Sequence, residues 1–172
     1  MTMIIDLSSV RAEPRTIKNS FDIGEIDLEG EDVKLTAPVE LIADISKLAT
    51  KTSLTGTIST SISRDCTRCL EPVQGGLMFE FETSFVDEEP GAAKADVEVR
   101  PEDLDISLVV DGKVSLAEVV REQILLALPI QNFCRSDCRG LCQKCGANLN
   151  LIDCNCSGED IDPRWAALKG LK

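Results

Sequence analysis

Residues 33–45 read VKLTAPVELIADI, and the alternation of apolar and polar side chains in this stretch decides the fold. Every second residue from Val33 to Ile45 is apolar, and the residues between them are mostly polar. A period of two is typical of a strand with one buried face and one solvent-exposed face. Pro38 cannot donate a ladder hydrogen bond, so it predicts an edge position or a bulge within this strand.

Two further alternating stretches follow along the chain. In the first, Leu54, Ile58 and Ile62 share one face, with Thr and Ser between them. In the second, residues 77–86 place three of the five phenylalanines and a leucine on one face, opposite glutamates. Three alternating strands in succession predict an antiparallel meander with one wet face. Residues Met3–Leu7 are expected to add a short strand.

A single amphipathic helix is predicted after the strands. Ser115 and Glu118 have the spacing of a capping box, which marks the start of a helix. Pro129 disfavours helical geometry at the preceding residue and so predicts its end. The inward stripe consists of Leu116, Val119, Val120, Ile124, Ala127 and Leu128. We expect this helix to cover the apolar face of the sheet.

Two connecting segments are predicted from their turn residues and charge. Residues 87–105 are strongly acidic and contain two prolines, which indicates a flexible loop with a short strand at Val97–Val99. The stretch Val109–Val114 contains Asp-Gly and is expected to form a tight turn.

Charge and composition narrow the class of protein. Hydrophobic residues make up 43% of the 172 residues and aromatic residues only 3%, so a packed, largely aliphatic core is expected. Residues 1–133 carry 12 Lys and Arg against 25 Asp and Glu, a net charge of −13, whereas residues 134–172 carry a net charge of +1. An acidic surface repels a phosphate backbone, so extended RNA binding is not expected.

The compartment follows from the same inspection. No apolar run approaches the ~20 residues of a membrane span, and the first residues lack the basic region of a secretory signal. A reducing, cytoplasmic location is therefore expected, with no membrane partner. In such a compartment cysteines are read as metal ligands before disulfides.

All eight cysteines lie in close pairs, and the chain contains no histidine. The pairs are Cys66 and Cys69, Cys134 and Cys138, Cys142 and Cys145, and Cys154 and Cys156. Tetrahedral zinc takes four thiolates, and two short chelating turns supply them. Four pairs therefore predict two structural zinc sites, with no open coordination position for catalysis.

Three pairings of the pairs are conceivable. We favour Cys142, Cys145, Cys154 and Cys156 as one site, because an eight-residue loop closes it compactly. The other site then consists of Cys66, Cys69, Cys134 and Cys138, and it joins the turn between the second and third strands to the tail. The main competitor groups Cys134, Cys138, Cys142 and Cys145, and leaves Cys66, Cys69, Cys154 and Cys156 for the second site.

The expected architecture is therefore α+β, an antiparallel meander covered by a helix and followed by a cysteine-rich, zinc-bound segment. We expect residues 1–133 to form the body and residues 134–172 a zinc-binding tail packed on it. The tail has too few apolar residues to order itself without a staple. Asp162 and Pro163 predict the start of a short terminal helix that ends near Leu171.

Several motifs together resemble the YceD family, the large ribosomal RNA subunit accumulation proteins. The matching stretches are Cys66-Thr-Arg-Cys69-Leu70, Glu122-Gln-Ile-Leu-Leu-Ala-Leu-Pro129, Cys138-Arg-Gly-Leu-Cys142-Gln-Lys-Cys145-Gly-Ala-Asn-Leu-Asn150 and Asp162-Pro-Arg164. The resemblance implies a role in accumulation or processing of large-subunit rRNA. It brings no catalytic activity and does not say which residues contact a partner.

The expected function is a non-enzymatic factor that acts on the large ribosomal subunit precursor, through ribosomal proteins or assembly factors, with no small-molecule substrate. One alternative is an RNA-processing hydrolase, which would need an open metal position or a carboxylate cluster. Another is a redox or zinc-responsive regulator that uses Cys66 and Cys69, although their motif lies between two predicted strands rather than at the start of a helix. A modest basic patch on the tail, or ordinary solvated charges, is expected from Arg135, Arg139, Lys144, Arg164, Lys169 and Lys172.

Overall fold

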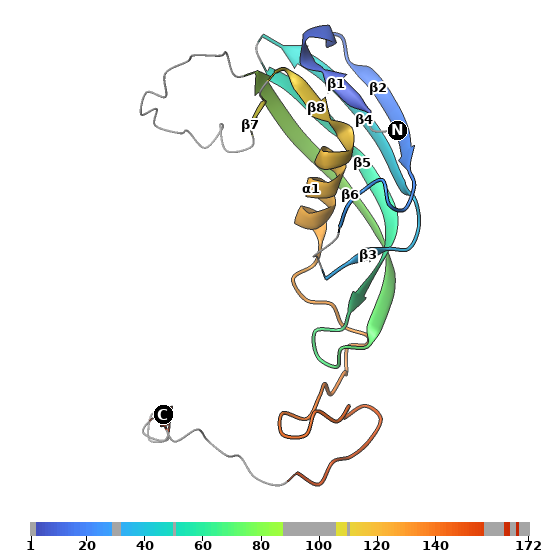
Figure 1. The fold of residues 1–172 in the computed structure, drawn as a ribbon, viewed down its shortest axis with the longest axis vertical. Coiled ribbons are helices and arrows are strands. Elements are labelled where there is room, and N and C mark those ends of the chain that lie inside the picture. Colours follow the sequence, from blue (N-terminus) through green and yellow to red (C-terminus); the bar gives the residue numbers. More distant parts are fainter. Residues whose placement is uncertain are drawn as a thin grey trace.

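A computed structural model describes residues 3–28, 32–49, 51–87, 106–109, 111–156, 164–165 and 168. Its main sheet has the strand order β2-β4-β5-β6-β7, and β3 pairs with β5 beside this path (Figure 1). The strands are β2 (Arg15–Phe21), β3 (Lys34–Leu35), β4 (Val39–Leu48), β5 (Lys51–Asp65), β6 (Pro72–Asp87) and β7 (Ile106–Val109). The fold is α+β, with a mostly antiparallel sheet, as the alternation predicted.

The predicted meander is confirmed in β4, β5 and β6, which pair antiparallel in sequence order. The inward residues Leu54 and Ile58 are fully buried, and Val39 and Leu41 lie beside them in the same core. Pro38 separates β3 from β4, so the alternating stretch of the sequence forms two strands along one edge of β5. The interruption predicted at Pro38 is thus confirmed.

Two strands of the main sheet were not predicted. β2 pairs antiparallel with β4, and only Ile17 and Phe21 of its seven residues are buried. β7 pairs parallel with β6, which makes the sheet mixed rather than purely antiparallel. The predicted loop at 87–105, with its strand at Val97–Val99, lies outside the described residues except for Asp87, the last residue of β6.

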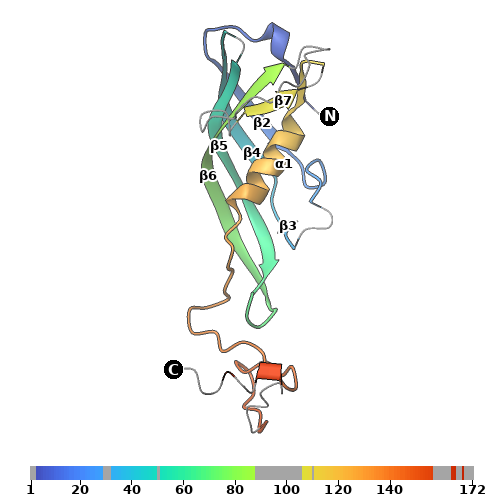
Figure 2. The same cartoon turned by 90° about the vertical axis from the view of Figure 1, so that its left-hand side faces the viewer.

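A second layer lies against one face of this sheet. It consists of β1 (Ile4–Asp6), the 3-10 helix η1 (Leu7–Ser9), β8 (Lys113–Ser115) and α1 (Leu116–Ala127). β1 and β8 form a separate antiparallel pair, and α1 runs across the face of the sheet (Figure 2). The predicted strand near the N-terminus is confirmed. So is the turn before β8, where Asp111 and Gly112 have φ values of 64° and 61°.

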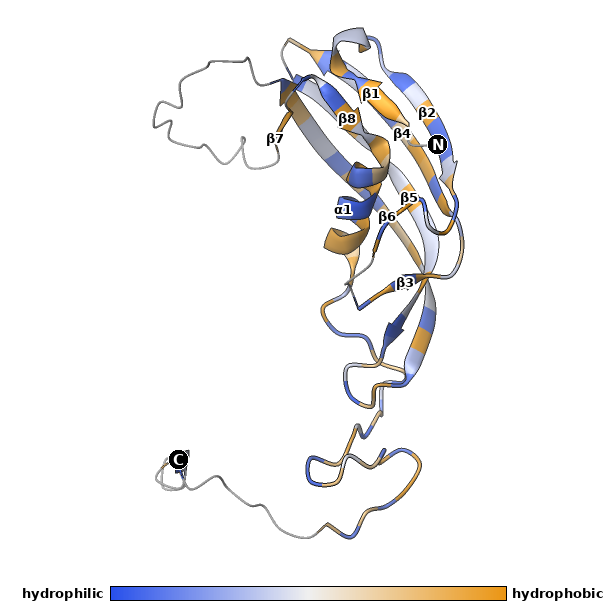
Figure 3. Cartoon of the chain, in the orientation of Figure 1, coloured by the Kyte–Doolittle hydropathy of each residue, from blue (hydrophilic) through white to orange (hydrophobic). Residues whose placement is uncertain are grey.

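The helix begins and ends where its capping residues predict. The Ser115 hydroxyl accepts a hydrogen bond from the Glu118 backbone N–H at 3.4 Å, and Leu128 before the proline leaves helical geometry. Leu116, Val120 and Ile124 are fully buried and join the core of the sheet. Apolar residues alternate along the strands in Figure 3, as a sheet with one covered face requires.

The β5–β6 hairpin extends as a two-stranded ribbon beyond the other strands. The pair runs from Lys51 opposite Val86 to Asp65 opposite Pro72, whereas β4 leaves β5 at Ser59 and β3 pairs only with Ile62 and Ser63. The chain leaving α1 returns to the distal end of this ribbon, where the tail lies (Figure 1). Arg64 fixes that return by donating from Nη1 to the Pro129 carbonyl at 2.7 Å.

The remaining predictions of the fold concern the tail. The terminal helix predicted for residues 163–171 lies largely outside the described residues, of which only 164, 165 and 168 belong to it. The division into a body of residues 1–133 and a tail of residues 134–172 stays a prediction. Among the helices of the described part of the chain, none is long and apolar enough to cross a membrane.

Candidate metal centre

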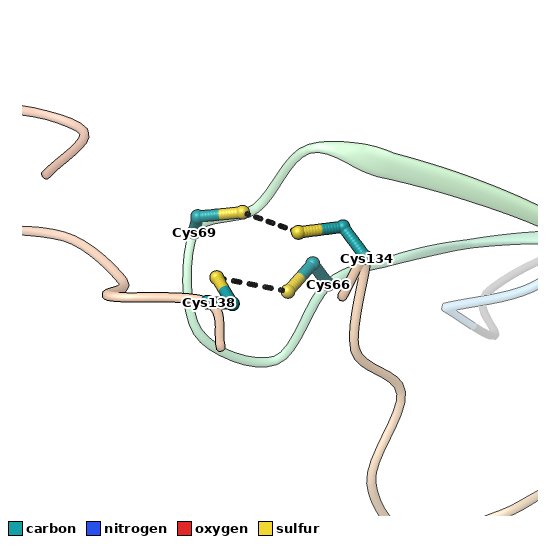
Figure 4. Close-up of side chains that lie close together, drawn as sticks. All are labelled: Cys66, Cys69, Cys134 and Cys138. Atoms are coloured by element: carbon teal, nitrogen blue, oxygen red, sulfur yellow. Dashed lines mark hydrogen bonds between the residues drawn. The ribbon is translucent and has the colours of Figure 1, made fainter. Parts of the chain in front are cut away.

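The turn that joins β5 to β6 holds its two cysteines by backbone hydrogen bonds. The Leu70 N–H donates to the Cys66 carbonyl at 2.9 Å, and the Cys66 N–H donates to the Glu71 carbonyl at 2.8 Å. Leu70 occupies the left-handed region with φ 61°, an uncommon conformation for a large side chain. Both cysteine side chains of this turn point into the group that they form with Cys134 and Cys138 (Figure 4).

A second turn in the tail repeats the same pattern. The Gly146 N–H donates to the Cys142 carbonyl at 2.9 Å, and the Cys142 N–H donates to the Ala147 carbonyl at 2.8 Å. Gly146, with φ 71°, takes the left-handed position that Leu70 takes in the hairpin. The chain therefore builds two equivalent chelating turns from the spacing Cys-x-x-Cys, one on the sheet and one on the tail.

The hairpin turn forms a tetrad with two cysteines of the tail, which we call tetrad 1: Cys66, Cys69, Cys134 and Cys138. The Cys69–Cys134 and Cys66–Cys138 Sγ–Sγ distances are 3.6 and 3.9 Å, and all four sulfurs lie within 4.8 Å of one another (Figure 4). A tetrahedron of sulfurs at ~2.3 Å from a central ion has edges of about 3.8 Å. A disulfide would need about 2.05 Å. The spacing of the sulfurs fits a four-coordinate metal ion.

The second cluster, tetrad 2, lies within the tail and consists of Cys142, Cys145, Cys154 and Cys156. Its sulfurs also lie within 4.8 Å of one another, and its residues are half-buried or exposed. Both tetrads group the cysteine pairs as the favoured pairing does, and the competing pairing is not formed. Whether a metal occupies them stays a prediction.

Each tetrad contains a cysteine whose pKa is lowered strongly by backbone N–H groups. Burial raises the pKa of Cys66, but N–H groups of Arg68, Cys134 and Cys69 outweigh it and lower this pKa to about 6. In tetrad 2, the N–H groups of Cys145 and Lys144 are the main cause that lowers the pKa of Cys142 to about 6. These N–H donors stabilise negative charge on sulfur, which is the form that binds metal.

One cysteine of each tetrad, Cys134 or Cys156, has a strongly raised pKa. Cys134 is exposed as a residue, but its sulfur faces the other three, and desolvation followed by contacts with those sulfurs raises its pKa to about 12. In tetrad 2, contact with Cys145 is the main cause that raises the pKa of Cys156 to about 12. Once one of four sulfurs this close is a thiolate, its negative charge disfavours ionisation of the others, whereas a bound dication favours it.

Residues beside tetrad 1 join the tail to the hairpin, and the cysteine pattern alone did not indicate them. Arg68 donates from Nη1 to the Cys138 carbonyl at 3.0 Å, and its guanidinium lies 4.3 Å from the centre of the Phe133 ring. The Leu141 N–H donates to the Arg68 carbonyl at 3.0 Å. Arg68 therefore bonds to the tail with both its side chain and its backbone. Its place inside the Cys66–Cys69 motif was the available signal.

The basic residues expected on the tail are largely engaged with other groups. Arg135 pairs with Asp137 at 3.4 Å, and Arg139 pairs with Asp153 at 3.0 Å. Lys144 and Arg164 also interact with other groups, and the two remaining lysines of the predicted patch lie outside the described residues. Within the described tail, these contacts favour the interpretation as ordinary surface charges.

A sheet whose longest hairpin ends in a four-cysteine cluster, closed by a tail with a second such cluster, defines a cysteine-clamped α+β protein. Residues 54–172, more than half of the chain, match the family model described as large ribosomal RNA subunit accumulation protein YceD. The chain belongs to this family, as the resemblance of its motifs predicted.

Curated relatives match nearly the whole chain at distant identity. An uncharacterized protein of Mycobacterium leprae is 28% identical over 98% of this chain and 77% of its own length. The chloroplastic large ribosomal RNA subunit accumulation protein YCED homolog 1 of Zea mays is 27% identical over 96% of this chain and 64% of its own length. The protein of the same name from Arabidopsis thaliana is 26% identical over 97% of this chain and 56% of its own length. No solved structure matches the chain.

Proposed function

We propose that this protein is a non-enzymatic factor in large ribosomal subunit biogenesis that promotes accumulation or processing of large-subunit rRNA. Membership of the YceD family carries the proposal, supported by the names of the plant relatives. The proposed site of action is the cytoplasm, where thiols stay reduced and available to metal.

We further propose that each tetrad holds one structural Zn²⁺. Four thiolates at tetrahedral spacing suit zinc, and they leave no coordination position for a substrate or an activated water. That closed donor set supports a structural rather than a catalytic role. When bound, zinc would hold the tail to the hairpin through tetrad 1 and fold the tail on itself through tetrad 2.

Charge supports contact through proteins rather than through extended RNA binding. The chain has a net charge of −12, and Arg135 and Arg139 of the tail pair with carboxylates. Ribosomal proteins and assembly factors with basic surfaces are the proposed partners. The purified protein should therefore form no tight complex with structured RNA near physiological salt. Sub-micromolar, steeply salt-dependent binding would contradict this part of the proposal.

Depletion of the protein in its own cells tests the function. The expected result is a lower ratio of large-subunit to small-subunit rRNA, with the protein co-sedimenting with large-subunit precursors and crosslinking there to a protein. An unchanged ratio would refute the ribosomal role. Cleavage of precursor rRNA by the purified protein would instead favour the hydrolase.

Elemental analysis of anaerobically purified protein tests the metal. Two Zn²⁺ per chain are expected from the two tetrads. A ratio near zero with eight free thiols would refute zinc binding, and a ratio near one would refute the assignment of a site to each tetrad.

A further inference from the structure

Asn150 lies in the loop of tetrad 2, but its side chain contacts tetrad 1. The loop consists of the eight residues between Cys145 and Cys154. The Asn150 amide donates from Nδ2 to the Cys138 Sγ at 3.3 Å and to the Asn148 Oδ1 at 2.9 Å. One half-buried side chain thus connects the cluster that folds the tail to the cluster that clips the tail onto the sheet.

The orientation of this amide is determined by its other partners. Its Oδ1 accepts from the Arg139 backbone N–H at 2.8 Å and from the Arg135 Nη2 at 2.8 Å. Both partners are donors only, so an amide turned the other way would face two donors with its own N–H groups. The Nδ2 group must therefore point to Cys138.

The position of Asn150 depends on the loop that tetrad 2 closes. The Asn150 N–H donates to the Asn148 Oδ1 at 3.0 Å, and the Leu149 N–H donates to the Gly140 carbonyl at 2.9 Å. The loop begins and ends at a cysteine of tetrad 2. Hydrogen bonds of Asn148, Leu149 and Asn150 also hold it, but Leu151 and Ile152 are exposed and add little apolar contact. Metal at tetrad 2 would fix both ends of the loop and so strengthen the placement of the amide beside Cys138.

We propose that Asn150 couples the two metal sites, so that zinc at tetrad 2 raises the zinc affinity of tetrad 1. An N–H donor to a thiolate offsets part of the negative charge that four sulfurs gather around one dication. Partners of this kind typically change metal affinity by about 10–100-fold. Because coupling between two binding sites is reciprocal, zinc at tetrad 1 then raises the affinity of tetrad 2 by the same factor. This inference rests on the proposed zinc occupancy but not on the ribosomal role.

Zinc titration of the full chain tests the coupling, with free zinc set by a chelator buffer. Hydrogen exchange of residues 66–71 reports tetrad 1, and exchange of residues 142–147 reports tetrad 2. Asn150→Ala should weaken tetrad 1 by about 10–100-fold, and it should leave tetrad 2 nearly unchanged at free zinc concentrations where tetrad 1 is empty. Asn150→Asp keeps the acceptor for both arginines but loses the donor to Cys138, so it should weaken tetrad 1 at least as much. Asn155→Ala, at an exposed position between two cysteines, is the matched control and should change neither site.

A double-mutant cycle separates coupling from a local effect. Removing tetrad 2 with Cys142→Ser and Cys145→Ser should weaken tetrad 1 by a similar factor, because the loop no longer orders Asn150. Adding Asn150→Ala to that variant should then change tetrad 1 by less than about threefold, because the two effects are not additive. Additive losses, or a tetrad 1 affinity unaffected by Asn150→Ala, would overturn the proposal while zinc binding itself stands. Absence of zinc from the unmodified protein would overturn both.

Discussion

Removing the hairpin half of tetrad 1 should release the tail while leaving the sheet folded. The change is Cys66→Ser together with Cys69→Ser, which keeps the size of both side chains and removes two thiolate ligands. Cys69 and Cys134 are 65 residues apart in sequence and 3.6 Å apart at their sulfurs. A metal at this site therefore closes a long loop that no other covalent or metal link closes within the described residues.

The magnitude follows from the length of that loop. The loop-closure entropy of a cross-link spanning 65 residues corresponds to about 4 kcal/mol at 25 °C. This free energy alone approaches the lower end of the 5–15 kcal/mol typical of whole domains. It applies to unfolding of the whole chain, because the loop is freed only when the sheet and α1 unfold as well. Release of the tail from a folded sheet instead loses the metal–sulfur bonds of tetrad 1.

Hydrogen exchange of the zinc-loaded protein measures the effect. In the double variant, the amides of residues 134–141 should exchange much faster, and bound zinc should fall by one ion per chain. The free energy of global unfolding should fall by about 4 kcal/mol. Amides of β4 and of β5 before Ile62 should stay protected, because the core there does not involve the cysteines. The control, Cys142→Ser with Cys145→Ser, should expose residues after 141 and spare the hairpin turn at saturating zinc. Exchange that changes only at 66–71, with residues 134–138 fully ordered, would refute the reasoning.

Three smaller changes test the body and the second turn. Gly56→Ala would place its Cβ 2.5 Å from that of Ala43, so we expect the free energy of unfolding in urea to fall by about 1–3 kcal/mol. The control Gly75→Ala, whose Cβ would have nothing within 4 Å, should cost far less, and equal costs would contradict this. Ser115→Ala removes the helix cap and should cost about 1 kcal/mol by the same assay, and an unchanged midpoint would be inconsistent with the cap. Gly146→Ala puts a side chain at φ 71° and should cost about 1–2 kcal/mol of zinc affinity at tetrad 2 in a chelator competition; full affinity would show that the turn tolerates the strain.

The parts of the fold that were predictable are those where local pattern and final packing agree. Alternation identified β4 and β5, which bury one face along much of their length, and β6, whose buried residues lie in its second half. β2 has only two buried residues in seven, so its pattern is too sparse to separate it from a loop. β7 is four residues long, and no local feature indicates that it pairs parallel with the preceding strand, β6.

The grouping of the cysteines was predictable from the sequence, but the polar contacts around them were not. Short spacings identified the pairs, and the shorter loop favoured joining Cys142 and Cys145 to Cys154 and Cys156. The contacts of Arg68 and Asn150 were not predictable, because they depend on how the tail lies against the hairpin. Polar side chains on a loop carry no periodic signal, so only the folded chain identifies their partners.

The separation of 65 positions between Cys69 and Cys134 also sets a delay during synthesis. A ribosome adds about 5–20 residues per second, so the hairpin cysteines are made roughly 3–13 seconds before the tail cysteines that complete their tetrad. Throughout that interval the nascent hairpin presents two thiols, one of them with a pKa lowered to about 6 in the finished fold, without their partners. Translation speed and the supply of reductant and metal therefore enter the yield of correctly assembled protein, through a single pair of residues at the end of one hairpin.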